Sequence, residues 1–439
     1  MTCLSVVEYE TLSIVTQLDS PDHRALSLVE LDRLHQVSQN LKVRLIDHVA
    51  RNQVRFRQFV GLIRLGDRDI ELLPKIESVD ANEPPAGIRM NLLQMLIVAT
   101  DTKVQFFGNA GAALARANWL DVFIQLFCRE LLDQLRRGMI RCYRDEEDDL
   151  SVVRGRILMD QQLTRNFVHR ERVACEFDDL DENHALNQLL KLALVKMRWV
   201  ARRNETHRLI DSLLLSFDSV VLPQTGAPWW RDVRLDRLSM RYESSVRMAN
   251  IFLSGLSPDV SGGRDDSFAI VFDMNSLFEE YIGRLLRKVL MQEGLCVRLQ
   301  HASHFLMHAQ DGSTNLFQIR PDIVVTNGNE TVCIGDTKWK RLFFEERKYG
   351  VAQADVYQML AYADRYRCER VMLVYPFHRK SGVLAEDSQL LTYQGRSTTV
   401  LIGQVDLQNL SSVPARLLRL YRQVTNQFKA TLSGTYAAG

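Results

Sequence analysis

Three residues of one short segment, Asp322, Asp336 and Lys338, have the types and the spacing that metal-dependent chemistry needs. The segment covers residues 320–340 and reads RPDIVVTNGNETVCIGDTKWK. Successive side chains of a strand alternate between its two faces, so Asp336 and Lys338 are expected on the same face. Asp322 begins the preceding strand, and residues 327–329 form the turn between the two strands. The sequence therefore predicts a hairpin that carries two carboxylates and one ammonium group.

The face that Asp322 occupies depends on the length of this turn. With a three-residue loop, Thr326 pairs with Glu330, and Asp322 lies opposite Ile334 on the face that carries Asp336. A two-residue loop shifts the register by one residue and places Asp322 on the other face. A shared site therefore predicts an odd loop length, such as a turn with a glycine bulge.

Two carboxylates that converge in a mainly apolar strand repel one another and are costly to remove from water, so a cation must offset them. Lys338 can do so in part, and Mg²⁺ does so better because it takes hard oxygen ligands and keeps several waters. We expect Asp322, Asp336 and the backbone carbonyl of Thr337 to hold Mg²⁺, or Mn²⁺ in its place. The metal would activate water and polarise a phosphodiester, while Lys338 would orient or deprotonate that water and stabilise charge on the phosphate. The predicted reaction class is metal-dependent phosphodiester hydrolysis.

Two flanking helices carry further candidate residues. Gln358 and Tyr362 lie four residues apart in a helix expected over residues 351–366, so both can project toward the same groove. An amide and a phenol there suit a phosphate backbone and a metal-bound water. Glu279, in a helix expected over residues 274–294, is a candidate outer metal ligand, although Glu279 and Glu280 together also fit a solvated helix turn. The alternative for the whole hairpin is a surface ion pair of little energetic value.

The elements that would position these residues form a separate α/β unit near the C-terminus. A turn-rich linker at residues 257–266 precedes it. Leu277, Phe278, Tyr281 and Ile282 begin an apolar stripe in its first helix, and Gly294 lies where a C-cap glycine is expected. Further strands are predicted around residues 296–299, 316–319, 371–376 and 398–407, and a last helix from about residue 413.

The rest of the chain divides into a β-rich and a helical part. Residues 59–76 read as two strands joined at Gly66-Asp67, and residues 78–87 read as a linker. Helical spacing dominates from residue 88 to about residue 217. Within that part, the acidic run RDEEDD at residues 144–149 is interpreted as a solvated loop. We expect an α+β multidomain fold with a β-rich N-terminal domain over residues 1–87, a mainly helical region over residues 88–260, and an α/β domain over residues 265–439.

Composition gives broad limits only. At 439 residues the chain exceeds what one hydrophobic core usually supports. Its net charge of +1 means that binding to a polyanion must depend on local basic surface. Seven scattered cysteines without C-x-x-C pairs indicate reduced thiols in a cytoplasm. Without a signal sequence or an apolar run near the roughly 20 residues that span a bilayer, a cytoplasmic protein with no membrane association is expected.

These residues resemble the PD-(D/E)xK nuclease superfamily, and within it the RecB-like branch with a Gln-x-x-x-Tyr helix. Asp322, Asp336 and Lys338 match the motif that names the superfamily. Gln358 and Tyr362 match the helix of the branch, and the acidic residue of its first helix matches Glu279, with Glu280 adjacent. The resemblance implies an endonuclease domain with a central mixed sheet flanked by helices.

The resemblance extends upstream, to the McrC subunit of McrBC-like, modification-dependent restriction systems. Six stretches carry it in order: FVGLIRLGDRDIELLPKI, VRGRI, CEFDDLDENHALNQLLKLAL, MNSLFEEYI, RPDIVV and GDTKWK. It implies that the chain cuts DNA, and that its N-terminal part docks on and stimulates an McrB-like AAA+ NTPase motor. The chain has no G-x-x-x-x-G-K-[ST] loop of its own. Residues 1–58 match no motif.

Several alternatives remain open at this point. Arg154 and Arg156 are candidates to reach the partner's nucleotide or DNA, and equally to bond acidic neighbours as structural arginines. The chain as a whole also fits a stand-alone RecB-like DNA repair nuclease, or a degenerate nuclease fold that only binds DNA or supports assembly. The intact set of Asp322, Asp336 and Lys338 argues against the degenerate form. The sequence does not specify the DNA sequence or modification that is recognised, the use of GTP or ATP, or the stoichiometry.

Overall fold

The computed structural model describes most of the chain, and its contacts divide the chain into two compact units. It describes residues 2–16, 24–66, 68–76, 86–100, 119–166, 168–169, 171–223, 229–255, 267–310, 314–342, 347–378, 388–394 and 397–435. Met1–Trp119 and Gly255–Gly439 form the first unit, and Leu120–Ser254 form the second. The expected linker at residues 257–266, and residues 78–85 of the other expected linker, lie outside the described residues. The three-domain division stays a prediction.

The N-terminal part of the first unit contains two four-stranded sheets. One has the order β1-β7-β6-β11, and the other has the order β3-β2-β5-β4. Their strands are β1 (Thr2–Val7), β2 (Thr11–Val15), β3 (Ala25–Ser27), β4 (Ile46–Ala50), β5 (Gln53–Phe56), β6 (Phe59–Leu65), β7 (Arg68–Leu73) and β11 (Ser267–Asp273). The predicted hairpin over residues 59–76 is confirmed, since Leu65 pairs with Arg68 across a two-residue loop.

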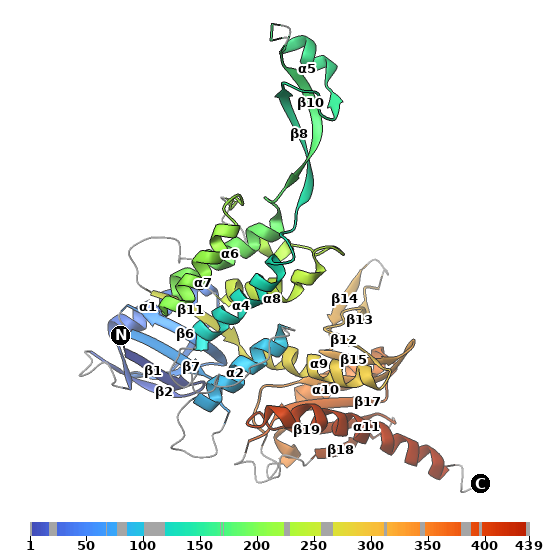
Figure 1. Ribbon diagram of the computed structural model, residues 1–439. Helices are drawn as coiled ribbons and strands as arrows, with labels where there is room; N and C mark the ends of the chain where they lie inside the picture. The colour runs from blue at the N-terminus through green and yellow to red at the C-terminus, as the bar shows by residue number, and fades with distance from the viewer. Residues whose placement is uncertain are drawn as a thin grey trace. The chain divides into compact units, whose positions relative to one another are not determined.

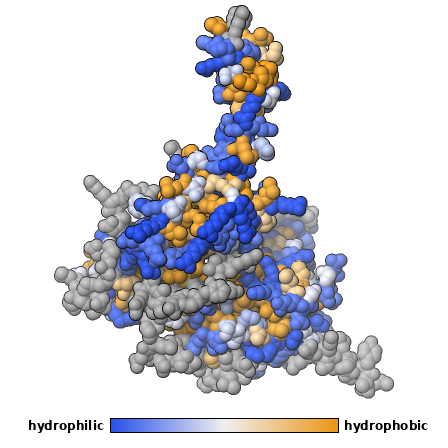
Figure 2. Space-filling model, viewed as in Figure 1, coloured by the Kyte–Doolittle hydropathy of each residue, from blue (hydrophilic) through white to orange (hydrophobic). Residues whose placement is uncertain are grey.

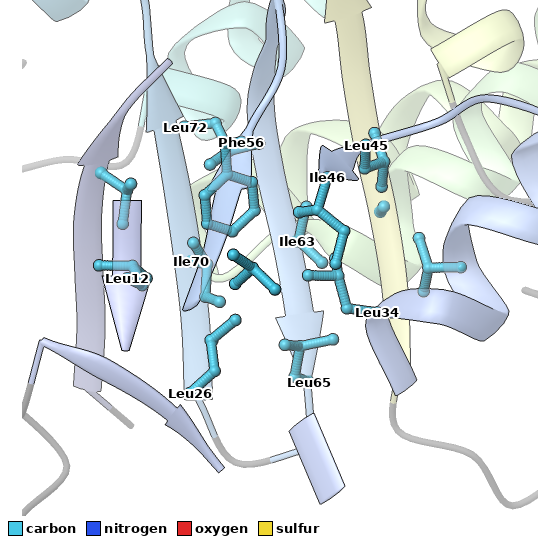
Figure 3. Close-up of a cluster of buried hydrophobic side chains, with 14 of the residues drawn as sticks. Leu12, Leu26, Leu34, Leu45, Ile46, Phe56, Ile63, Leu65, Ile70 and Leu72 are labelled. Carbon is cyan, nitrogen blue, oxygen red and sulfur yellow. The ribbon is translucent and has the colours of Figure 1, made fainter. Parts of the chain in front are cut away.

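A shared hydrophobic core joins these two sheets with helix α1 (Leu28–Leu41). Ser27 begins the helix with a capping box, in which Glu30 bonds back to the Ser27 backbone. Figure 3 shows side chains from both sheets and α1, among them Phe56 and Ile63, packed against one another. Full burial of one such side chain contributes about 1.5–3 kcal/mol, so this core holds the two sheets together.

A six-stranded mixed sheet forms the C-terminal part of the first unit, with the order β12-β15-β16-β17-β19-β18. Its strands are β12 (Cys296–Leu299), β15 (Ile323–Asn327), β16 (Glu330–Thr337), β17 (Arg370–Pro376), β18 (Ser388–Thr392) and β19 (Thr399–Val405). Strands β16, β17 and β19 are parallel, and the remaining pairs are antiparallel. A separate two-stranded ribbon pairs β13 (His304–His308) with β14 (Asn315–Ile319).

Helices cover both faces of this sheet. Helix α10 (Gln353–Arg365) packs its Met359 and Tyr362 on the face of Val324 and Ile334. Helices α9 (Met274–Gln292) and α11 (Val413–Thr435) cover the opposite face, where a Cβ on Gly403 would lie 2.6 Å from the Leu420 side chain. Helix α2 (Ala86–Ala99) packs against α9 (Figure 1). The α9 stripe is confirmed, and Gly294 follows the helix with φ +77°.

The second unit combines helices with one long antiparallel hairpin. Its helices are α4 (Trp119–Leu135), α5 (Met159–Thr164), α6 (Ala185–Val200), α7 (Asn204–Ser216) and α8 (Glu243–Gly255). Short 3-10 turns are η1 (Trp229–Asp232) and η2 (Met240–Tyr242) in this unit, and η3 (Arg347–Gly350) and η5 (Leu410–Ser412) in the first unit. Strands β8 (Cys142–Leu150) and β10 (Val173–Asp181) form the hairpin, with the short β9 (Arg156–Ile157) beside β10. Within this unit the hairpin extends away from the helices and carries α5 near its tip (Figure 1).

The interpretation of residues 144–149 as a loop is wrong, because they lie in β8 and pair with β10 along its full length. Their side chains are largely exposed, so the expected solvation is present without the expected conformation. Backbone pairing with β10 outweighs the repulsion between like charges that face water. The described chain is thus mixed α/β with several sheets, as predicted at the level of fold class. Among its described helices, none combines the length and apolar character that crossing a bilayer requires.

Candidate functional site

The turn between β15 and β16 differs from the predicted one. It has two residues, since Asn327 pairs with Glu330. Gly328, at its first position, has φ +58°, the positive value that two-residue hairpin turns of the primed types require there. The expectation of an odd loop length is therefore wrong, and so is the pairing of Thr326 with Glu330.

A bulge farther along the hairpin corrects the register that this short turn would impose. Thr326 pairs with Thr331, but Val325 pairs with Cys333, which leaves Val332 as an extra residue in β16. Such a bulge shifts every later pair by one residue.

As a result of this shift, Asp322 lies on the face predicted for it. Ile323 pairs with Gly335, so the next positions, Asp322 and Asp336, lie opposite one another, whereas we had expected Asp322 to lie opposite Ile334.

The buried Asp336 and the half-buried Asp322 form a mutually repelling pair at adjoining strand ends. Asp336 is only 1% exposed. Asp322 Oδ2 accepts hydrogen bonds from the Thr337 backbone nitrogen at 2.8 Å and from Thr337 Oγ1 at 3.0 Å. Burial, followed by the negative charge of Glu279, raises the pKa of Asp322 to about 6. Burial, followed by the charge of Asp322, raises the pKa of Asp336 to about 6. The positive charge next to the two aspartates is therefore too small to offset both carboxylates.

Lys338 is the cation that contacts this pair directly. Its Nζ lies 2.7 Å from Asp336 Oδ2 and donates to Gln358 Oε1 at 3.0 Å. Burial lowers the pKa of Lys338, but the nearby carboxylates, Asp336 first, outweigh it, so the net shift is upward. Gln358 Nε2 is 2.7 Å from Tyr362 Oη, and Tyr362 Oη donates to the Arg320 carbonyl at 3.3 Å. The strand and the helix are thus connected by one chain of polar contacts that fixes the Lys338 ammonium.

Glu279 and Glu280 differ clearly in their surroundings. Glu280 forms an ion pair with Arg284 one turn along the same helix, at 2.5 Å. Glu279 Oε1 instead accepts from Gln300 Nε2 at 2.7 Å. Burial raises the pKa of Glu279, and the charges of Glu280 and Asp336 add to the shift. Glu279 therefore lies within electrostatic range of the aspartate pair, as a candidate outer ligand would.

Sequence reasoning missed two buried carboxylates that contact Trp339 and Lys340, the residues just after Lys338. Asp355 is buried and binds Lys340 Nζ at 3.0 Å. It precedes Gln358 by three residues on α10, a spacing that could have identified it. Glu8 is also buried and accepts from Trp339 Nε1 at 2.8 Å, and burial raises its pKa to about 7. No local pattern could have connected Glu8 with a residue so far away in the sequence.

The oxygen ligands present here suit Mg²⁺, which keeps part of its water shell, better than a metal ion that protein ligands enclose completely. Among the described residues, no group of three His, Cys, Asp or Glu side chains is placed to hold a metal by itself. Asp322 and Asp336 provide hard carboxylate oxygens, and Thr337, which follows Asp336 in the chain and donates two hydrogen bonds to Asp322, provides a backbone carbonyl. Mg²⁺ typically binds through one or two carboxylates and keeps several waters. A divalent cation would also relieve the repulsion that raises both aspartate pKa values.

Comparison with known proteins adds a family and a fold. The family model described as "McrBC 5-methylcytosine restriction system component" matches residues 54–376. No curated protein matches the chain. A solved chain from the half-complex of Thermococcus gammatolerans McrB AAA+ hexamers with bound McrC has a TM-score of 0.61 and 18% identity, covering 96% of this chain and 100% of that one. A chain from the Thermococcus gammatolerans McrBC complex has a TM-score of 0.49 and 20% identity, covering 66% of this chain and 88% of that one. Because the sequence identity is only 18%, the similarity to the first of these solved chains shows a shared fold.

Proposed function

The chain belongs to the family of McrBC 5-methylcytosine restriction system components, as its motifs predicted, and we propose that it is the DNA-cleaving, McrC-type subunit of such a system. It hydrolyses phosphodiesters with Mg²⁺ through a C-terminal domain of the PD-(D/E)xK type. The observation that carries this proposal is the convergence of Asp322, Asp336 and Lys338 at the adjoining ends of β15 and β16.

Each residue of the centre has a role that follows from its contacts. Asp322, Asp336 and the Thr337 carbonyl hold the metal ion. When bound, Mg²⁺ polarises the phosphodiester and lowers the pKa of a water molecule. Lys338, whose raised pKa keeps it an ammonium, orients that water and stabilises the negative charge that develops on the phosphate.

Two further residues support these roles without supplying charge to the reacting atoms. Gln358 holds Lys338 through its carbonyl oxygen, and Tyr362 holds Gln358 in turn. Both are positioning residues in this proposal. Glu279 would act as an outer ligand, because its charge acts on the same site as that of Asp336.

A cleavage assay tests the site directly. Wild-type protein is incubated with DNA and Mg²⁺, with and without an McrB-like AAA+ protein, beside the Asp336→Ala and Lys338→Ala variants. Lys340→Ala is the matched control, because Lys340 lies only two residues after Lys338 but pairs with Asp355. We expect both site variants to lose cleavage and the control to retain it. Cleavage by both site variants at the wild-type rate would show that the assigned site is wrong.

We also propose that an McrB-like AAA+ NTPase is the partner. The chain of similar fold comes from an assembly of McrB AAA+ hexamers with bound McrC. The resemblance places docking in the N-terminal part of the chain. The β8–β10 hairpin is a second candidate surface, because its outer end exposes the apolar side chains of Val152, Val153, Met159, Leu163 and Val168. Figure 2 shows apolar residues gathered at this end.

The two arginines of the hairpin bond acidic neighbours in this structure. Arg154 pairs with Asp179 at 2.8 Å and lies over the Phe177 ring, and Arg156 pairs with Glu176 at 2.5 Å. These pairs support the structural interpretation of both arginines in the free chain. Any contact of Arg154 or Arg156 with a partner's nucleotide would require the pairs to open.

A pull-down with an McrB-like AAA+ protein separates this proposal from a stand-alone RecB-like repair nuclease. Retention of the motor on the immobilised chain, together with faster cleavage in its presence, supports the restriction subunit. Full cleavage without any motor binding supports the repair nuclease. Motor binding without cleavage under any metal condition supports a non-catalytic assembly module.

A further inference from the structure

A basic cavity of about 540 Å³ opens beside the proposed catalytic centre, between β12, the β15–β16 turn and the end of α10. Its basic lining consists of Arg298, His301, His304, Arg365 and Arg367. Asp364 is the one carboxylate in this lining, and most of the remaining wall is polar, with Val324 and Tyr366 as its larger apolar surfaces. A cavity with this excess of cationic groups attracts anions.

The three arginines of this cavity lack ion-pair and hydrogen-bond partners among the described residues. Within the part of the chain that the structure describes, the side chains of Arg298, Arg365 and Arg367 form no ion pair and no hydrogen bond, and the buried Arg365 Nε is unsatisfied. By contrast, Arg284 and Arg422 of the same unit pair with Glu280 and Glu293. An unsatisfied buried donor costs free energy unless a ligand accepts from it.

The histidine side of the cavity is held in place by one tyrosine. Tyr366 Oη donates to the His301 carbonyl at 2.6 Å, and its ring lies 4.3 Å from that of His304. The pKa of His304 is lowered, first by burial and then by the positive charges of Arg365 and His301. The wall is therefore formed without a ligand, and its electrostatic field is positive.

The cavity lies on the same face of the sheet as the aspartate pair. Arg298 pairs across strands with Val324, two residues beyond Asp322 on β15, which is about 7 Å along the strand. On α10, Arg365 and Tyr366 lie about one turn, or roughly 5 Å, beyond Tyr362. An extended chain of anions that passes the centre would thus reach the arginines next.

We propose that this cavity binds phosphate groups of the DNA strand whose scissile phosphodiester lies at Asp322 and Asp336. The inference rests on the proposed nuclease function. It adds the place at which the DNA next to the cleaved bond is held. Guanidinium groups suit this role because their paired donors match phosphate oxygens. A backbone with one phosphate per nucleotide supplies the row of anions that the geometry requires.

Salt-dependent DNA binding tests this assignment. A fluorescent 20-base-pair duplex is titrated with full-length wild type, Arg298→Ala, Arg365→Ala and the double variant, without divalent metal, from about 50 to 200 mM salt. Each lost phosphate contact should reduce the slope of log Kobs against log salt by roughly 0.9 and weaken binding by about tenfold at low salt. Arg422→Ala is the matched control, since Arg422 is exposed and paired with Glu293.

Two further arms separate a phosphate contact from other causes. Arg365→Lys should recover most of the slope, because a point charge still attracts phosphate, whereas a purely structural role would not be recovered. Calorimetry with inorganic phosphate alone asks whether the cavity is a free-anion site. Phosphate binding that is lost in the double variant while the DNA slope stays at the wild-type value would overturn the proposal.

Failure of this inference is distinguishable from failure of the nuclease proposal. A wild type that cuts DNA, together with a double variant that keeps the wild-type slope and affinity, refutes the cavity assignment alone. A wild type that binds DNA with the expected slope but never cuts refutes the catalytic proposal and leaves the binding result standing. Thermal unfolding of Arg298→Ala, which alters one exposed side chain, checks that the fold is intact.

Discussion

The protein contains two antiparallel hairpins rich in carboxylates, and they treat those carboxylates in opposite ways. The β15–β16 pair buries Asp336 and raises the pKa of both Asp322 and Asp336 to about 6. The β8–β10 hairpin carries many more acidic groups, including the cross-strand pair Asp145 and Asp178, and leaves most of them in water. Desolvation, rather than the number of carboxylates, therefore distinguishes a candidate metal site from a solvated acidic surface.

The two hairpins also differ in their countercharges. On β8–β10, Arg144, Arg154 and Arg156 each pair with an acidic residue of β10, at 2.5–3.5 Å. Beside the aspartate pair, Lys338 is the one basic residue of the described chain that makes a direct ion pair with Asp336. The β8–β10 hairpin thus pairs part of its carboxylates with its own arginines and leaves the others to water, whereas the aspartates of β15–β16 need a further cation.

The largest expected effect is the loss of catalysis when a buried aspartate is removed. Asp336→Ala should reduce the cleavage rate by roughly 10³-fold, because it removes a charge that the reacting groups contact. Asp148→Ala, on exposed β8, should leave the rate unchanged. Initial rates of plasmid cleavage at saturating Mg²⁺ measure both. Equal losses of rate in the two variants would show that burial of the carboxylate does not decide whether it takes part in catalysis.

The second prediction concerns stability and its dependence on pH. A carboxyl group whose pKa is raised in the folded state binds its proton more tightly there than in the unfolded chain. The free energy of unfolding of the metal-free protein therefore falls as pH rises from about 4 through about 6. Asp336→Asn lacks this loss and should be more stable than wild type above pH 6, by about 1–3 kcal/mol.

Urea unfolding at pH 4 and pH 7.5 measures this difference. The advantage of Asp336→Asn should be small at pH 4 and fully present at pH 7.5. Mg²⁺ should stabilise the wild type and not the variant, because only the wild type keeps the full ligand set. Asp148→Asn should show neither effect. An Asn variant no more stable than wild type at pH 7.5 would contradict the raised pKa.

The same contrast explains what could be predicted from the sequence. Alternation along a strand placed Asp336 and Lys338 on one face, and helical spacing placed Gln358 beside Tyr362. These relations are local, and they depend on one element each. We did not predict that the acidic residues 144–149 form a strand, because a run of like charges indicates side chains that face water and does not indicate the backbone conformation.

The position of Asp322 depended on a feature with no local signal. The two-residue turn alone would have placed Asp322 on the wrong face, and the bulge at Val332 restores the shared face. Nothing about a valine in a strand marks it as the extra residue. The contact between Glu8 and Trp339 is also set by the packing of distant segments, which spacing along the chain does not describe.

The third prediction tests whether the β8–β10 hairpin serves binding rather than chemistry. Leu163→Ser and Val168→Ser replace exposed apolar side chains near its outer end. We expect roughly 10-fold to 30-fold weaker binding to an McrB-like motor, since desolvated apolar anchors dominate interfaces. Cleavage measured without the motor should not change.

Surface titration of immobilised motor measures the affinity, and Leu215→Ser, an exposed apolar residue at the end of α7, is the matched control. Wild-type affinity in both hairpin variants would remove the hairpin as a docking surface. Docking would then be left to the N-terminal part of the chain.

The smallest expected effect compares two glutamines that each touch one of the hairpins. Gln358 accepts from Lys338 at 3.0 Å, whereas Gln161 of α5 donates to Glu147 of β8 at 2.5 Å. Gln358→Ala should lower the cleavage rate by about 3-fold to 10-fold, because Lys338 keeps its contact with Asp336 but loses its hydrogen bond to one uncharged acceptor. Gln161→Ala should have no effect on the rate.

The distinction between a positioning residue and a structural one lies in what Gln358→Ala leaves unchanged. If Gln358 acts through Lys338, kcat falls while KM for DNA and the Mg²⁺ dependence stay at their wild-type values. Gln358→Glu, which keeps an acceptor for Lys338, should recover much of the rate. A loss in Gln358→Ala that appears mainly in KM would instead indicate that Gln358 contacts the DNA. The polar contacts from Lys338 to Tyr362 would then result from packing and would not serve to position Lys338.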